Sequence, residues 1–291
     1  MKIVWIVLAV VVAMAGVHRL QVSIDEQRSE GTAVRSLMHL PDGEVLKFVS
    51  LGYQNVVADL IWLRIIQVFG DRTVTEDGYN WIYNALDAVT TLDPQFVQAY
   101  LAGSMTLTVM ADHVEQSNRI LEKGIAADLE EWRIPFTLGF NYFNFLRDYR
   151  HAAKYVEMAA TMPGTPDWLP LLAARLHVQA DAPQLALEFI TRVYEATTDE
   201  GLKAKLEIRI KEVMIERDLM AMKRAVERYQ VRHGSRPERL SQLVETGILK
   251  HIPLEPFGGT YTLDSETTEL SSSSRPERMK VYHPHQRKQD G

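Results

Sequence analysis

The chain has no cysteine among its 291 residues. This excludes disulfide bonds, thiolate nucleophiles, cysteine-based zinc sites and lipid attachment at cysteine. It also lacks an excess of basic charge, because the formal net charge is -6 and the isoelectric point is about 5.9. A surface that binds nucleic acid needs clustered Lys and Arg, so we expect no nucleic-acid partner.

The sequence carries none of the common catalytic motifs: no His-Glu-x-x-His, no Gly-x-Ser-x-Gly, no Walker loop and no dinucleotide-binding glycine motif. Its carboxylates, including Glu212 and Glu216, follow the spacing of a helix surface and are predicted to be solvated. No nucleophile or general base stands out by type and spacing. We therefore predict no catalytic residue and a protein that is not an enzyme.

The nine histidines are scattered along the chain. His151 and His177 lie within helical segments, where a hydrogen-bonded packing role is expected. His283 and His285 are the best candidates for metal ligands, but their position beside Pro284 in a polar tail favours exposure to solvent. We predict no metal site and no cofactor.

One long apolar run opens the chain, from Ile3 to Val17 behind Lys2. It is shorter than the roughly 20 residues of a full membrane span, although Leu20 can extend it. The small residues around Met14 also fit a signal-peptide cleavage site. Residues 1–20 are thus an anchor, a cleaved signal or a buried core helix. We expect a single-pass anchor in the inner (cytoplasmic) membrane, with the bulk on the extracytoplasmic, periplasmic side.

A polar stalk is predicted over residues 21–44, and helical periodicity then extends over residues 45–201. The breaks in this region recur every 35 or 36 residues, at Asp93, Asp128, Pro163 and Asp199. Small residues recur at the same interval inside the helical segments, at Gly103, Gly139 and Ala174. A constant period with two helical runs in each copy predicts stacked helical hairpins.

The segment from Trp132 to Thr165 resembles the tetratricopeptide repeat (TPR). Gly139 takes the small position of that motif, and Leu138 and Tyr142 take the adjoining Leu and Tyr positions. Pro163 takes the closing proline. The resemblance implies an all-α solenoid with a concave groove that binds a partner.

The segment 51–71 resembles the opening unit of uncharacterised, membrane-anchored bacterial TPR proteins. The Asn55-x-x-Ala58-Asp59-x-x-Trp62-Leu63-Arg64 run carries this resemblance. Two charges stand in an otherwise apolar helix here, at Asp59 and Arg64. Because buried charges need partners, we expect these two side chains to clamp neighbouring hairpins.

The stretch FTLGFNYFNFL, residues 136–146, contains five aromatic residues. Phe136, Phe140 and Phe143 form one helical stripe. By analogy with the repeat, this stripe faces the concave groove, and the flanking copies add Tyr100, Leu107, Trp168 and Leu171. Three interpretations are open: a groove for a protein partner, a groove filled by the chain's own stalk or C-terminal segment, or plain core.

The last third of the chain predicts a long closing helix over residues 202–233 and a small α+β module over residues 234–291. The module should contain a short helix at 238–246 and a strand at 260–264. A second strand at 278–282 would pair with the first across a flexible connection at Ser271–Ser274.

This layout resembles the C-terminal part of the major pseudopilin of type II secretion, and the resemblance implies a setting in secretion or pilus-type assembly. The residues that carry it are Tyr229, Gly234, Pro237, Leu240, Leu243, Pro256, Phe257, Gly258 and Tyr261.

Together these patterns predict a non-catalytic, membrane-anchored scaffold that binds a protein partner in the cell envelope. The alternative is a module that binds a small apolar ligand or lipid within the aromatic solenoid. A third hypothesis, a hydrolase in the C-terminal module, requires a cluster of convergent polar residues there.

Overall fold

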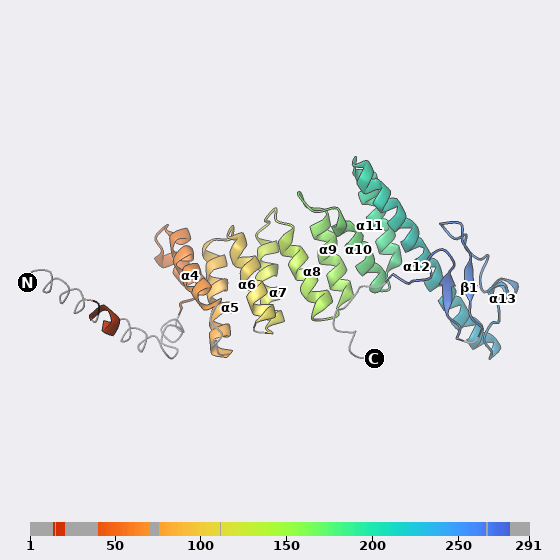
Figure 1. Cartoon of the computed structure of the whole chain (residues 1–291), viewed down its shortest axis with the longest axis horizontal. Helices are drawn as coiled ribbons and strands as arrows, with labels where there is room; N and C mark the ends of the chain where they lie inside the picture. The colour runs from red at the N-terminus through yellow and green to blue at the C-terminus, as the bar shows by residue number, and fades with distance from the viewer. Residues whose placement is uncertain are drawn as a thin grey trace, which may run out of the picture. The chain divides into compact units, whose positions relative to one another are not determined.

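The computed structural model describes residues 14, 16–20, 40–69, 76–110, 112–265 and 267–279. The chain is mostly helical, as predicted (Figure 1). It divides into two compact units, Met1–Ile120 and Leu121–Gly291, and the division falls within helix α7 (Val114–Ala126).

The first unit contains α3 (Gly43–Val49), α4 (Gln54–Phe69), α5 (Glu76–Leu92) and α6 (Val97–Val109). Helix α5 packs against the other three. The small residue Gly103 is required where α5 and α6 meet, because a methyl group there would collide with the side chain of Leu86. Gly78 lies inside the first turn of α5.

The predicted clamp at Asp59 and Arg64 is wrong, since both side chains are exposed on α4. This helix buries the stripe formed by Ala58, Ile61 and Ile65. Asp59 and Arg64 lie off that stripe and therefore need no buried partner.

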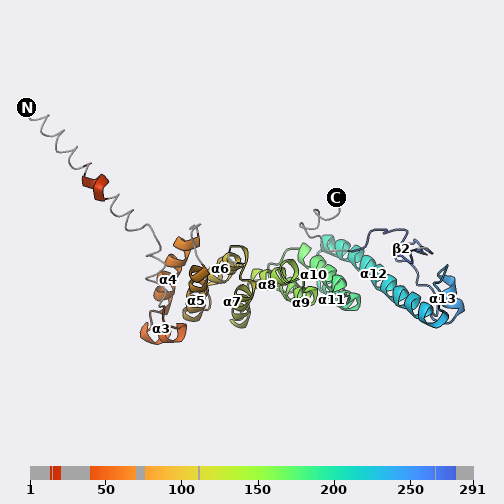
Figure 2. The ribbon, with the colours of Figure 1, turned by 90° about the horizontal axis from the view of Figure 1, so that it is seen from below.

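The second unit continues with α8 (Arg133–Asn144), α9 (Tyr149–Ala160), α10 (Trp168–Gln179), α11 (Pro183–Ala196) and α12 (Glu200–His233). From α8 onward each helix packs against the next, in chain order (Figure 2). Their shared stack core is built from residues of α9 to α12: Ala152, Val156, Leu169, Ala173, Leu176, Phe189, Ile190, Leu206 and Val213. Gly139 and Ala174, two of the small residues that recur in sequence, are both buried.

Helix α12 is 34 residues long and ends where predicted, at Gly234 with φ 68°. Its first half contributes Leu206 and Val213 to the stack core. Its second half packs against a separate module core, formed by Ile215, Leu219, Met222, Val226, Tyr229, Leu243, Tyr261 and Leu270. One continuous helix thus joins the helical stack to the C-terminal module (residues 234–279).

The C-terminal module contains α13 (Ser241–Glu245) and two short antiparallel strands, β1 (Tyr261–Leu263) and β2 (Leu270–Ser272). Tyr261 pairs with Ser272 and Leu263 with Leu270. The predicted second strand at 278–282 is therefore wrong as the partner of β1, because a short turn after Asp264 brings residues 270–272 back first. Residues 280–282 lie outside the described part of the chain.

Glu216 is not the solvated surface charge that its spacing predicts, since it is only 5% exposed. Its carboxylate accepts hydrogen bonds from the Met279 N–H at 2.6 Å and the Arg278 Nε at 2.8 Å. The strap, which we define as residues 273–279, runs back from the module over this face of α12 and buries it.

Within the described residues, no helix has both the length and the apolar character needed to cross a membrane. Most of the predicted anchor, and residues 21–39 of the predicted stalk, lie outside the described part. His283 and His285 also lie outside it.

Candidate partner-binding surface

Helix α8 gathers aromatic side chains because they are spaced three or four residues apart. The ring centroids of Trp132 and Phe136 are 5.9 Å apart, and those of Phe136 and Phe140 are 6.4 Å apart. Phe140 in turn contacts Phe143 at 5.2 Å and Phe145 at 6.2 Å. These five rings form a continuous row.

Trp168, at the start of α10, extends this row across to the next hairpin. Its ring meets Phe136 edge-on, with centroids 5.5 Å apart and an interplanar angle of 76°. Tilted and edge-on pairs at such distances are favourable arrangements of aromatic rings. We name the set of six the aromatic surface: Trp132, Phe136, Phe140, Phe143, Phe145 and Trp168.

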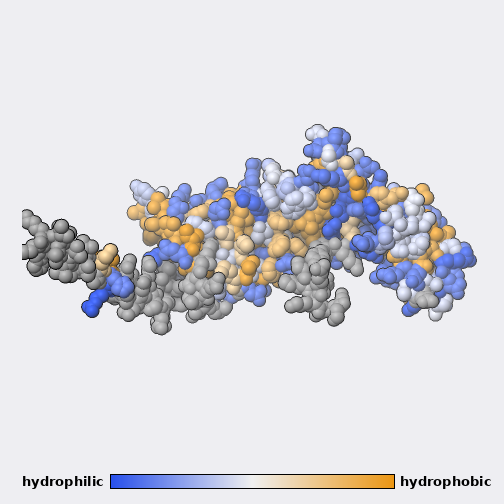
Figure 3. Space-filling view, viewed as in Figure 1, coloured by the Kyte–Doolittle hydropathy of each residue, from blue (hydrophilic) through white to orange (hydrophobic). Residues whose placement is uncertain are grey.

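The aromatic surface is partly buried and partly open to solvent. Phe136 and Phe143 pack against the stack core. Phe140 and Phe145 are each 37% exposed, and Trp168 is 46% exposed. Apolar side chains reach the surface at several places along the helices (Figure 3). The row therefore contacts the stack core on one side and solvent on the other.

Of the seven residues predicted to line the groove, four belong to this surface: Phe136, Phe140, Phe143 and Trp168. Leu171, one turn after Trp168, is half-buried and packs against the stack core. These five residues come from two neighbouring hairpins of the second unit.

Tyr100 and Leu107 do not line an exposed groove, because neither has any exposed surface. Both lie on the face of α6 that also carries Gly103, which approaches α5 closely. The Tyr100 hydroxyl donates to the Pro94 carbonyl at 3.2 Å. Burial, with Asp93 and Asp87 nearby, raises the pKa of Tyr100 to about 12. Tyr100 and Leu107 occupy the same repeat positions in α6 as Phe136 and Phe143 do in α8, but packing in the first unit buries them completely.

Sequence reasoning missed a cleft of about 710 Å³ over α9, α10 and α11. Its lining combines apolar side chains with the basic residues Arg150, Lys154 and Arg192. Lining residues from α9 and its C-cap Thr161 lie four, seven, eight and eleven positions after Arg150, a helical stripe that can be read from sequence. The cleft is lined by Arg150, Lys154, Glu157, Met158, Thr161, His177, Ala180, Ala182, Leu185 and Arg192.

Among the described residues that line this cleft, Glu157 is the one acidic side chain. It binds His177 Nε2 at 2.6 Å and Arg192 at 2.9 Å. The hydrogen bond from His177, helped by the charge of Arg192, holds the pKa of the Glu157 carboxyl below its usual value. The hydrogen-bonded packing role predicted for His177 is confirmed, since this side chain is 7% exposed and held between helices.

His151 also has the predicted hydrogen bond, although its side chain is exposed. Its ring lies 2.6 Å from the Asp148 carboxylate and stacks on Tyr142 with centroids 5.0 Å apart. Among the described residues, no group of three or more His, Asp or Glu side chains could hold a metal ion.

No protein-family model matches the chain, and no curated protein is significantly similar to it.

Proposed function

We propose that the protein is a non-catalytic scaffold that binds a partner protein at the aromatic surface of α8 and α10. One observation carries the proposal. Three large aromatic side chains, Phe140, Phe145 and Trp168, are already held in a packed row yet keep more than a third of their area exposed.

Such a row favours binding for two physical reasons. Exposed aromatic side chains that cluster together supply much of the binding energy of protein interfaces. Their ring contacts also limit their rotamers in the free protein, so less conformational entropy is lost when a partner binds. Isolated exposed rings on a flexible loop would have neither advantage.

The setting is part of the same proposal. The 35- and 36-residue period and the small residue at each hairpin resemble a TPR solenoid, a fold that commonly binds peptides and helices. The apolar start would hold the chain at the inner membrane, and the pseudopilin-like end favours a role in secretion or pilus-type assembly. This assignment to the cell envelope rests on those resemblances.

The test places a photo-crosslinking amino acid at Phe140 or at Trp168 in the full chain, in cells that make the protein. A matched control carries the same amino acid at Val231 on α12, which is 89% exposed and distant in sequence from the aromatic surface. We expect one common adduct from positions 140 and 168 and none of that mass from 231. In a competition arm, untagged Phe140→Ala/Trp168→Ala protein should not reduce the adduct, whereas untagged wild-type protein should.

Equal adducts from all three positions, or none from 140 and 168, would show that the row is only the margin of the core. Circular dichroism of the purified double variant checks that it folds. Because both side chains are partly exposed, we expect it to keep the helical content of the wild type.

The alternative function, binding of a small apolar ligand or lipid, is favoured by the cleft over α9 to α11. Its lining includes the exposed Leu185 together with Arg150 and Lys154, which suit an apolar chain with an acidic head group. If this is correct, a fluorescent fatty acid should bind the purified protein, and Leu185→Glu should weaken binding at least tenfold. Leu254→Glu, at a 93% exposed position of the module, is the control. An equal affinity for wild type and Leu185→Glu would exclude the cleft.

A further inference from the structure

A second cleft, of about 350 Å³, lies where α10, α12 and the strap meet. Charged side chains make up most of its lining, and four of them are arginines. We name it the arginine cleft; its lining residues are Arg175, Arg209, Glu212, Ile215, Glu216, Arg275, Glu277, Arg278 and Met279.

The carboxylates of this cleft do not balance its guanidinium groups. Both carboxylate oxygens of Glu216 already have partners. One binds Arg278 Nη2 at 2.6 Å and Nε at 2.8 Å, and the other accepts from the Met279 N–H. Glu277 is exposed at the margin. The other three arginines share two acidic side chains of the lining, Glu212 and the exposed Glu277, so the described lining keeps an excess of positive charge.

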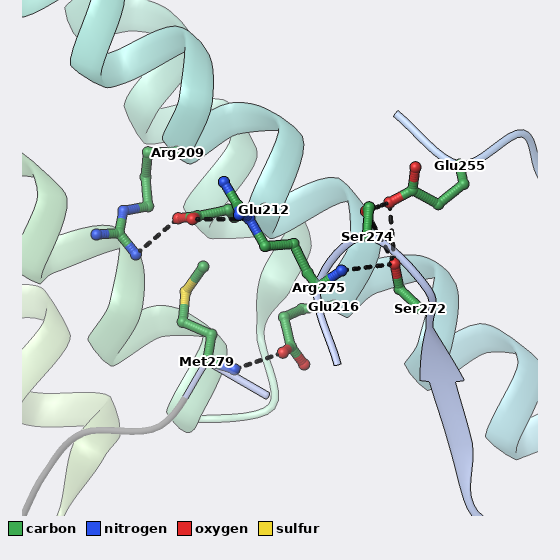
Figure 4. A network of polar contacts seen from close by, with 8 residues as sticks. All are labelled: Arg209, Glu212, Glu216, Glu255, Ser272, Ser274, Arg275 and Met279. Carbon is green, nitrogen blue, oxygen red and sulfur yellow. Dashed lines mark hydrogen bonds and ion pairs between the residues drawn. The ribbon is translucent and has the colours of Figure 1, made fainter. Parts of the chain in front are cut away.

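Glu212 is shared between two of these arginines. Arg209 approaches one carboxylate oxygen at 3.1 Å, and Arg275 approaches the other at 3.6 Å (Figure 4). The Arg209 side chain is only 15% exposed, so water does little to screen its charge.

Arg175 is the remaining arginine, and it comes from α10. Its Nε is buried and has no hydrogen-bond partner among the described residues. A buried donor without an acceptor is costly, and more so on a charged group. Burial lowers the pKa of the neighbouring Arg209; Glu212 opposes that shift and Arg175 adds to it. The two cations are thus close enough to repel each other.

We propose that the arginine cleft is a binding site for a small oxyanion of the phosphate or carboxylate class. Such an anion accepts hydrogen bonds from the guanidinium groups that line the cleft, and its negative charge offsets the repulsion between Arg175 and Arg209. Guanidinium groups suit this role because their planar N–H pairs match the oxygens of phosphate and carboxylate groups. The bound anion also ties α10 to the strap through Arg275.

The test is thermal unfolding of the full-length protein in sodium phosphate, in sodium succinate and in sodium chloride at equal pH and ionic strength. An anion that binds only the folded state raises Tm with concentration. We expect a rise of about 2–4 °C at an anion concentration near ten times Kd. A rise in phosphate alone identifies a phosphate site, and a rise in succinate alone identifies a carboxylate site. Equal curves in all three salts would overturn the proposal.

Arg175→Gln distinguishes a ligand site from an ordinary structural arginine. This variant should lose the anion-dependent rise in Tm, while its Tm in chloride stays equal to that of the wild type or increases. A structural arginine would show the opposite, with a lower Tm in chloride and an unchanged response to the anion. Arg275→Gln is a second variant at a partly exposed position, and it should reduce the response. Arg239→Gln, on the module surface, is the matched control and should respond fully.

Discussion

Replacing Glu255 by alanine is expected to lower the stability of the C-terminal module by about 3 kcal/mol. The side chain is 7% exposed, and its carboxylate accepts four hydrogen bonds. The N–H groups of Phe257 and Gly259 donate to one oxygen, at 2.8 and 2.7 Å. The hydroxyls of Ser272, at 2.9 Å, and of Ser274 donate to the other. Alanine leaves all four donors without their acceptor.

Glu255→Gln should be much milder, at about 1 kcal/mol. The amide oxygen can still accept from the two backbone N–H groups, and the amide nitrogen can donate to the serine oxygens. The measurement is hydrogen exchange of peptides covering β1 and β2, where a loss of 3 kcal/mol lowers protection by about a hundredfold. Glu245→Ala, an exposed carboxylate of the same module, is the control. If alanine and glutamine had equal effects, the four hydrogen bonds would not explain the stability.

The same carboxylate should make the module sensitive to acid. Burial raises the pKa of Glu255, but the four hydrogen bonds outweigh burial and hold it below its usual value. A lowered pKa in the folded state means that the stabilisation is complete above the pKa of the unfolded chain and is lost as the pH falls toward the folded value. The advantage of wild type over Glu255→Gln should therefore shrink below about pH 4.

Gly139→Val is expected to destabilise the helical stack by about 3 kcal/mol or more. A Cβ atom at this position would lie 2.7 Å from Val156 Cγ2, 3.1 Å from the Ala152 carbonyl oxygen and 3.2 Å from the Val156 nitrogen. The side chain of Val156 can rotate, but the backbone of α9 cannot move without separating the two helices. Valine adds two further methyl groups in the same space.

Gly139→Ala should cost about 1 kcal/mol, because the higher helix propensity of alanine offsets part of the clash. Urea unfolding followed by tryptophan fluorescence measures both variants, since Trp132 and Trp168 report on this unit. Ala204→Val adds the same branched side chain at an exposed position of α12 and measures the propensity cost alone. A Gly139→Val variant as stable as Ala204→Val would contradict the close helix contact.

Local patterns in the sequence predicted the helices and their close contacts. Gly103 and Gly139 stand where helices meet, and Gly234 ends α12 in the left-handed conformation that favours glycine. The aromatic row was predicted from spacing within α8, and Trp168 was placed beside it by the repeat period. These features depend on residues close in sequence or one period apart.

Features that depend on distant residues were not predicted. Glu216 has the spacing of a helix-surface carboxylate, and only the strap, more than 60 residues later, buries it. Tyr100 and Leu107 occupy the repeat positions of Phe136 and Phe143, but packing closes them in the first unit. Ser272 was expected in a flexible connection and instead lies in β2, where it binds Glu255. In each case burial was decided by a segment that the local pattern does not contain.

Helix α12 also has a mechanical consequence. It contains no proline, and its one glycine, Gly201, is in the first turn, so it offers no hinge over a length of about 50 Å. Leu206 and Val213 are fixed in one core, and Met222 and Tyr229 in the other. A rotation of the C-terminal module about the axis of α12 must therefore also rotate Leu206 and Val213. The helix couples the orientation of the two cores.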